Sequence, residues 1–328
     1  MNSETLEKIN HLANKYKEIG LDLNTVLEGL YESKPLNYWD YLNLEALLAL
    51  QNPRTDYPDE IVFITYHQVT ELYFKLILHE IDQILNAPPQ KENILKRIKR
   101  IASYFKQLST SFETMVIGMD TEQFLRFRLT LVPASGFQSV QYRIIEIKST
   151  TLINLVHYPL RKKYDSCSPL SEIYANLYWK YGNRREEDGE KTVTLKRFEE
   201  KYDTQLYALA EACREKNLWF YYQNLSEDIK NDKEIIESLR NFDLQANVFW
   251  PLSHYKVAAK YFSQPYPATI TQGTGGTNWK EYLPPKKQHV IFFPELWNEQ
   301  EHQEWGAGPM QELFTQQVEH FWQTQAKF

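Results

Sequence analysis

The segment from about residue 59 to residue 85 limits the fold more than any other part of the chain. Its apolar side chains, among them Phe63, Leu72 and Ile81, recur at helical spacing. They are too numerous for one narrow stripe, so the pattern predicts a long helix that is buried on most of its sides. The sequence Ala87-Pro88-Pro89 ends this helix, because proline cannot continue it.

The rest of the chain shows the same helical period. Further helices are predicted over about residues 3–20, 42–50, 91–116, 121–131, 137–150, 226–262 (with an interruption near Pro251) and 309–327. Strand-type alternation is nearly absent, and only 11 of 328 residues are glycine. The predicted fold is therefore all-α, a helical bundle in one domain over residues 1–328. Residues 183–203 are expected to form a charged, solvated excursion and the start of a helix, and residues 263–298 to be irregular.

Composition and charge exclude several classes of protein. With 37 basic and 43 acidic residues the net charge is −6, which argues against nonspecific nucleic-acid binding because that needs a basic face. The sequence contains no run of about 18 apolar residues, so it predicts no membrane-spanning helix. Two cysteines, Cys167 and Cys213, cannot form a disulfide framework or a cysteine-rich metal site. The polar N-terminus does not resemble a signal peptide, so a cytoplasmic location is expected.

Eight histidines are the first candidates for chemistry, but none has the paired spacing of a two-histidine zinc helix. A haem site is different, since one imidazole holds the iron and the porphyrin supplies four other ligands. Such a site leaves almost no spacing signal. His67 shares a helix face with Phe63, four residues earlier. Taken alone, His67 is more simply interpreted as a hydrogen-bonded core histidine.

Two further features are ambiguous when taken alone. Arg128 lies four residues after Phe124, and its planar guanidinium could pair with an acidic side chain or with a substrate carboxylate. The loop Gly273–Thr277 lacks the lysine and the preceding strand of a phosphate loop. Its glycines allow a ligand to approach the backbone closely, and Thr274 would add a hydroxyl, but a simple turn explains the loop equally well.

Taken together, several segments change this interpretation. They are Tyr38-Trp39-Asp40-Tyr41-Leu42, Phe63-Ile64-Thr65-Tyr66-His67-Gln68-Val69-Thr70-Glu71-Leu72, Phe127-Arg128 with Pro133-Ala134-Ser135-Gly136-Phe137-Gln138-Ser139, Trp250-Pro251-Leu252-Ser253-His254 and Gly273-Thr274-Gly275-Gly276. In this order and spacing the chain resembles the tryptophan 2,3-dioxygenase family. The resemblance extends from about residue 36 to residue 277.

The resemblance implies an all-helical haem b enzyme, assembled as a homotetramer, with the haem between helices. It implies that O₂ oxidatively opens the indole ring of L-tryptophan to give N-formylkynurenine. His254 would bind the iron, and His67 would lie on the distal side near the indole N–H. Leu131, Ser135 and Gly136 match family positions that line the haem or the substrate.

The resemblance also implies a substrate pocket. Phe63 would form a wall of the indole pocket, Arg128 would bind the substrate carboxylate and Thr274 the ammonium. Phe124 stands near the carboxylate. Tyr38, Tyr41 and Leu42, in an N-terminal arm over residues 1–50, would come from a neighbouring subunit and close the pocket. This logic is physically consistent, because an amino acid brings two charges that need partners and a flat apolar ring that suits aromatic walls.

Departures from the family pattern keep other functions open. Phe124 stands where the family often has tyrosine, and Leu129 where an acidic residue commonly follows the arginine. One alternative keeps the fold and changes the chemistry, to a haem-dependent monooxygenase or hydroxylase of an aromatic amino acid such as tyrosine or of an indole derivative. Another is a helical protein that binds haem or an aromatic ligand without turnover. A third is a helical scaffold without a ligand.

Overall fold

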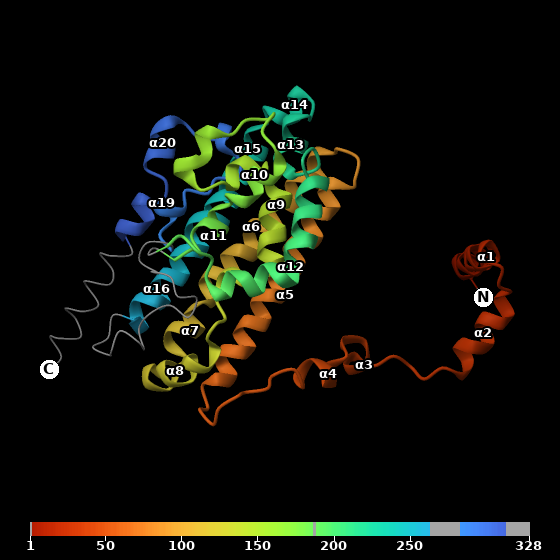
Figure 1. Ribbon diagram of the computed structural model, residues 1–328. Coiled ribbons are helices and arrows are strands. Elements are labelled where there is room, and N and C mark those ends of the chain that lie inside the picture. The colour runs from red at the N-terminus through yellow and green to blue at the C-terminus, as the bar shows by residue number, and fades with distance from the viewer. Residues whose placement is uncertain (1, 186–187, 263–282, 313–328) are drawn as a thin grey trace. The chain divides into compact units, whose positions relative to one another are not determined.

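The structure is a computed structural model that describes residues 2–185, 188–262 and 283–312 (Figure 1). Over these residues the regular structure is helical, apart from two isolated β-bridges, Val156–Leu177 and Arg184–Lys191. The all-α prediction is therefore confirmed. The chain divides into two compact units, Met1–Asn52 and Pro53–Phe328.

The first unit is a set of short helices with no interior. Its elements are α1 (Ser3–Glu18), α2 (Leu23–Glu32), α3 (Tyr38–Leu42) and α4 (Leu44–Leu48). Local signals define them: Asp22 caps α2 by accepting hydrogen bonds from the backbone N–H groups of Asn24 and Thr25. None of the four helices contains a buried residue. Apolar side chains such as Leu30 and Tyr31 are 62% and 87% exposed, so this unit has apolar surface that it cannot cover by itself.

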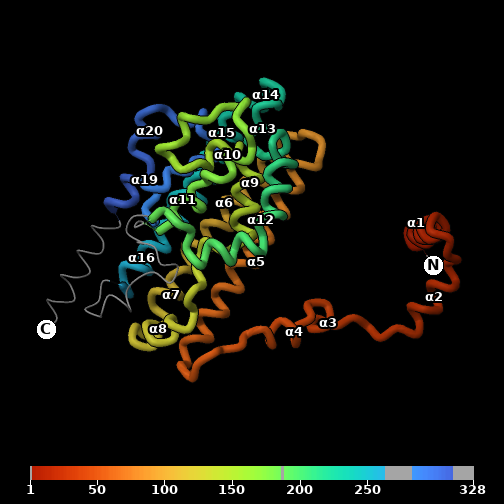
Figure 2. The backbone as a smooth tube through the Cα atoms, viewed as in Figure 1, coloured from red at the N-terminus to blue at the C-terminus, as the bar shows by residue number. Residues whose placement is uncertain are grey.

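The second unit is a bundle built on one long central helix. Its long helices are α5 (Glu60–Leu85), α6 (Lys91–Ser111), α9 (Val140–Ser149), α12 (Val193–Ala212) and α15 (Lys233–Leu244). Helix α5 packs against α6 and α9, and α15 also packs against α6 (Figures 1 and 2). Ile81, Ile101, Phe105 and Phe242 lie in the core that these helices share and are completely or almost completely buried. Burial of this apolar surface is the main stabilising term of the unit.

Short elements connect the long helices and cover their ends. They are α7 (Glu113–Ile117), α8 (Thr121–Phe127), η1 (Arg128–Leu131), η2 (Gly136–Gln138), η3 (Leu152–Leu155), η4 (Tyr158–Lys163), α10 (Leu170–Ala175), α11 (Tyr178–Tyr181), α13 (Leu218–Gln223), α14 (Glu227–Lys230), η5 (Gln245–Phe249), α16 (Trp250–Phe262), α19 (Pro285–Gln288), η6 (Pro294–Leu296) and α20 (Glu299–Gln303). Helices α7, α8 and α16 gather around one end of α5 (Figure 1).

The bounds predicted for the central helix agree with α5, but its predicted burial was wrong. Ile61, Val69, Leu72 and Leu76 are 40%, 37%, 48% and 45% exposed. They follow one another at helical spacing on the side of α5 that faces away from the core. Helix α5 therefore has two apolar faces. The described residues cover one of them, and the other is exposed.

The helix predicted over residues 226–262 is divided more than expected. After α14 and α15 comes η5, a π-helical turn in which the backbone N–H of Trp250 donates to the carbonyl of Gln245, five residues earlier. Pro251 gives the physical reason for the interruption: it has no N–H to donate to the carbonyl of Asn247, and its ring crowds that carbonyl. The helix continues from the π turn directly into α16.

Other predictions are confirmed in part. In the charged excursion, α12 begins at Val193, and Thr192 caps it by accepting from the N–H of Leu195 at 3.2 Å. The helix predicted over residues 309–327 is helical where the structure describes it, over 307–312, and most of it lies outside the described residues. None of the described helices is long and apolar enough to cross a membrane.

Candidate functional site

His67 lies on α5 with its ring held against its own helix. Its Nδ1 is 2.7 Å from the carbonyl oxygen of Phe63, and the two rings are 4.0 Å apart. The His67 side chain keeps much of its surface accessible, yet it lies so deep among protein atoms that desolvation lowers the pKa of the imidazole.

His254 lies on α16 in a tighter aromatic environment. Its Nδ1 is 3.2 Å from the carbonyl oxygen of Trp250. The rings of Trp250 and Phe112 contact it edge to face at 4.4 and 4.5 Å. Burial, with a smaller contribution from the charge of His67, lowers the pKa of His254 to about 4. The two imidazoles therefore lie close enough to influence each other, and His254 is neutral at pH 7.

The two histidines share one local geometry. In each, Nδ1 is hydrogen-bonded to the carbonyl four residues earlier, and no residue that the structure describes hydrogen-bonds to Nε2. When Nδ1–H donates to a carbonyl, the lone pair lies on Nε2, which is the arrangement that a metal-ligating histidine needs. Haem iron needs only one such protein ligand, because the porphyrin supplies four. His254, neutral and held in orientation, fits that role.

Phe112 joins the two histidines into one site, and sequence reasoning missed it. Its ring is 4.5 Å from His254 and 5.4 Å from Tyr66. The ring of Tyr66 in turn lies 6.2 Å from His67, and its hydroxyl donates to the carbonyl of Leu108 at 3.0 Å. In the sequence Phe112 is one apolar residue near the end of a predicted helix, so no signal distinguished it from the core.

Phe124, on α8, and Arg128, on η1, approach the same region. The ring of Phe124 is 4.4 Å from Tyr261 and 6.1 Å from Phe63. Arg128 is only 2% exposed, and its guanidinium lies 4.4 Å from the centre of the Phe262 ring. Burial lowers the pKa of Arg128 to about 10, so the side chain stays charged at pH 7. The structure thus brings a buried cation to an aromatic wall that includes Phe63.

Three predicted residues lie on the loop that follows Arg128. Leu131 ends η1, and Ser135 is the N-cap residue of η2, where its N–H donates to Oε1 of Gln138 at 2.9 Å. The amide of Gln138 also donates to the carbonyl of Thr194 at 3.1 Å, which anchors this loop to α12. A side-chain carbon added at Gly136 would meet no atom of the described residues within 4 Å, so these residues leave the backbone there open to a ligand. Within the described part of the chain, none of the three predicted residues hydrogen-bonds to His67 or His254.

The structure does not test the roles of the remaining predicted residues. Tyr38, Tyr41 and Leu42 lie in α3 of the first unit and are 71%, 74% and 41% exposed. Thr274 lies outside the described residues. Their roles stay predictions. The structure groups Phe63, His67, Phe124, Arg128 and His254, with Tyr66 and Phe112 between the two histidines.

Comparisons with known proteins show the family of the chain. The family model described as tryptophan 2,3-dioxygenase matches residues 28–240, which ends before His254. The chain is 28% identical to a tryptophan 2,3-dioxygenase of Ruegeria sp. (strain TM1040) over 279 residues, which cover 80% of this chain and 91% of the relative. It is 27% identical to that of Bacillus thuringiensis subsp. konkukian (strain 97-27) over 278 residues, 80% of this chain and 91% of the relative. A tryptophan 2,3-dioxygenase of Sorangium cellulosum (strain So ce56) is 40% identical over 127 residues, 35% of this chain and 31% of the relative.

The helical fold and these matches define an oxidoreductase enzyme. More specifically, the chain belongs to the tryptophan 2,3-dioxygenase family.

Proposed function

We propose that this protein binds haem b and uses O₂ to open the indole ring of L-tryptophan, giving N-formylkynurenine. The observation that carries the proposal is the grouping of a neutral, oriented imidazole at His254 with a second imidazole, an aromatic wall and the buried cation of Arg128. The names of the relatives support the same reaction.

His254 is the residue that would hold the iron. Its Nδ1 contact with the carbonyl of Trp250 directs the Nε2 lone pair away from the helix, and its low pKa keeps that lone pair available at neutral pH. When bound, haem supplies the activation of O₂. The protein then has to orient the substrate, exclude water and control the environment of the iron.

Arg128 would bind the substrate carboxylate. A guanidinium matches a carboxylate with two parallel hydrogen bonds, and burial strengthens the attraction because few water molecules compete. Thr274 would bind the substrate ammonium. These two contacts fix one end of an amino acid and leave its side chain to reach the reacting position.

The aromatic wall and His67 would hold the indole. Phe63 and Phe124 present flat apolar surface to a flat apolar ring. Because Nδ1–H of His67 donates to Phe63, its Nε2 is an acceptor that suits the single N–H of indole. His67 is therefore proposed as a group that orients the indole rather than as an obligatory base.

The first unit would complete the pocket in an assembly. Its helices bury none of their residues, so their apolar side chains need a partner surface. We propose a homotetramer in which Tyr38, Tyr41 and Leu42, from the arm over residues 1–50, close the pocket of a neighbouring subunit.

One experiment tests the reaction and separates it from the alternatives. The protein is loaded with haemin, reduced and mixed with L-tryptophan and ¹⁸O₂, and the product is identified by mass spectrometry. Ring opening with two labelled oxygen atoms supports the proposal. One labelled atom on an intact ring indicates a monooxygenase. This alternative stays open because Phe124 lacks the hydroxyl of the tyrosine that the family often has at this position. Haem uptake without turnover indicates a binding protein.

A further inference from the structure

The π turn η5 lies between Asp243 and His254 on one long helical segment. Helices α15 and α16 run continuously through it (Figure 1). Asp243 and His254 are eleven residues apart, about three full turns of an α-helix, so an uninterrupted helix would place them on one face. A π turn contains one extra residue and rotates everything after it by roughly 100°, the angle that one residue occupies in an α-helix.

The contacts on either side of η5 agree with this rotation. Asp243 lies fully buried against the segment that follows α19 and accepts hydrogen bonds from the N–H groups of Phe292 (2.9 Å), Phe293 (3.1 Å) and the indole of Trp297 (3.1 Å). His254 instead contacts Phe112, at the end of α6. The π turn thus allows one helix to fasten the C-terminal segment with one side chain and present an imidazole to the site with the other.

Two side-chain hydrogen bonds hold the turn itself. The hydroxyl of Tyr142, on α9, donates to the carbonyl of Ala246 at 3.1 Å. The amide of Asn247 donates to Oδ1 of Asp243 at 2.7 Å. Tyr142 and Asn247 are 8% and 4% exposed, so water does not readily replace either hydrogen bond. Pro251 explains why the α-helical ladder breaks here, but it does not select a π turn over a kink.

A chain of ring contacts also leads from Tyr142 to His254. The ring of Tyr142 is 5.4 Å from Phe74, Phe74 is 5.8 Å from Trp250, and Trp250 is 4.4 Å from His254. Trp250 also supplies the carbonyl that orients the imidazole. Tyr142 is therefore connected to His254 in two ways, through the backbone of η5 and through a chain of packed side chains.

We infer that Tyr142, Asn247 and Asp243 are positioning residues that hold η5 in its π conformation and so aim Nε2 of His254 at the iron of a bound haem. The inference rests on the proposed function, because it assumes that His254 is the iron ligand. It goes beyond that function in assigning the orientation of the ligand to three residues that do not touch the site.

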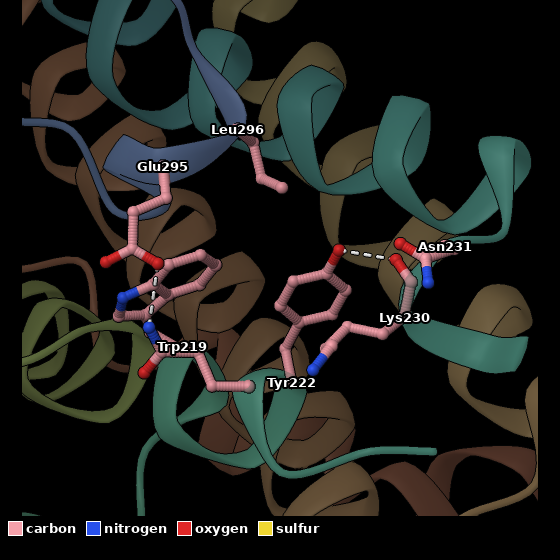
Figure 3. A pocket seen from close by; sticks show the side chains of 7 residues that line it. Trp219, Tyr222, Lys230, Asn231, Glu295 and Leu296 are labelled. Carbon is pink, nitrogen blue, oxygen red and sulfur yellow. Dashed lines mark hydrogen bonds between the residues drawn. The ribbon is translucent and has the colours of Figure 1, made fainter. Parts of the chain in front are cut away.

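The test compares two tyrosine variants of the full-length protein. Tyr142→Phe removes the hydroxyl that binds η5. Tyr222→Phe is the matched control: Tyr222 is 7% exposed, and its hydroxyl donates to the backbone carbonyl of Lys230 at 2.7 Å. Tyr222 does not line the candidate site. Together with Trp219 and Leu296 it lines a separate pocket of about 380 Å³ (Figure 3). Both variants lose one buried hydroxyl-to-carbonyl hydrogen bond, so a general loss of stability affects both.

The readouts are taken on protein loaded with haemin. The first is the iron–histidine stretching band of the reduced protein in resonance Raman spectra, which responds to the orientation of the imidazole. The second is the rate of haem transfer to excess apomyoglobin. Tyr142→Phe is expected to shift the band and to raise the transfer rate by roughly tenfold, as loss of an outer-shell partner of a ligating histidine does. Tyr222→Phe is expected to match the wild type in both.

Two outcomes overturn the inference, and they differ in what else they overturn. If the wild type shows a normal iron–histidine band and Tyr142→Phe matches Tyr222→Phe in both readouts, only the positioning role is wrong. If the wild type takes up no histidine-bound haem, the proposed function falls together with this inference. Should Tyr142→Phe fail to fold, Asn247→Ala, which removes the other hydrogen bond of the turn, is expected to shift the same band, and an unshifted band would refute the inference.

Discussion

Replacing Arg128 with leucine tests the substrate pocket most directly. Burial of this guanidinium lowers its pKa from 12.5 to about 10, which corresponds to about 3 kcal/mol of unfavourable desolvation. A bound carboxylate would offset that cost and form two charge-assisted hydrogen bonds. Arg128→Leu should therefore weaken binding of L-tryptophan by about 2–5 kcal/mol, which is roughly 30-fold to several thousand-fold in KM.

The control for this variant is a substrate analogue. Tryptamine keeps the indole and the ammonium but has no carboxylate, so its affinity should be nearly the same in the wild type and in Arg128→Leu. Arg128→Lys keeps the charge but loses the two-pronged geometry, and should be intermediate. Spectroscopic titration of the haem-loaded protein measures both ligands. Two results would show that Arg128 does not bind the carboxylate. One is that Arg128→Leu keeps the wild-type affinity for L-tryptophan; the other is that its affinity for tryptamine falls as much as its affinity for L-tryptophan.

Three further variants test other parts of the structure. His254→Ala should abolish haem retention, and a variant that kept a normal Soret band would show that another residue holds the iron. His67→Ala should lower kcat without eliminating turnover, and complete loss in a steady-state assay would mean that His67 has a chemical role. Burial raises the pKa of Glu146 to about 6, against the attraction of Arg143 at 3.0 Å, so the folded state retains this proton up to a higher pH than the unfolded chain. The stabilisation from this proton is complete below pH 4.5 and is lost as the pH rises through 6. Urea unfolding should show the wild type losing about 1.5 kcal/mol more than Glu146→Gln between pH 4.5 and 6.5, whereas parallel pH profiles would contradict the assignment.

The sequence predicted α5, α6 and α9 well because the helical period is a local property, whereas the short helices α10, α11 and α13 were not predicted. Helix α5 begins and ends within a residue of its predicted bounds, since Pro58 and the prolines at 88 and 89 leave little choice. The exposed face of α5 could not be predicted. Apolar residues recur at the same spacing whether their side chains pack against their own chain or against the surface of another molecule. The position of Pro251 indicated that the long helix is interrupted, but not that the interruption is a π turn, which depends on Tyr142 from a distant helix.

The candidate site was predicted less directly than the fold. Phe63 with His67 and Phe124 with Arg128 were recognisable as pairs four residues apart, and the structure brings both pairs to one aromatic wall. His254 had no signal of its own and emerged only from the resemblance. Phe112, Tyr261 and Phe262 were missed because their roles come from tertiary contacts between helices far apart in sequence, which no local spacing encodes.

The two histidines show why such a site is hard to find in a sequence. Each satisfies Nδ1 on the carbonyl four residues earlier in its own helix, so neither needs a recognisable partner elsewhere in the chain. Any histidine within a helix can form this Nδ1 hydrogen bond and so leave the lone pair of Nε2 available. The helix alone therefore does not determine which histidine binds iron. The surroundings distinguish the two: the rings of Trp250 and Phe112 confine His254 beyond a π turn, whereas His67 faces accessible space. A confined imidazole suits a fixed axial ligand, and an open one suits a substrate that must enter and leave.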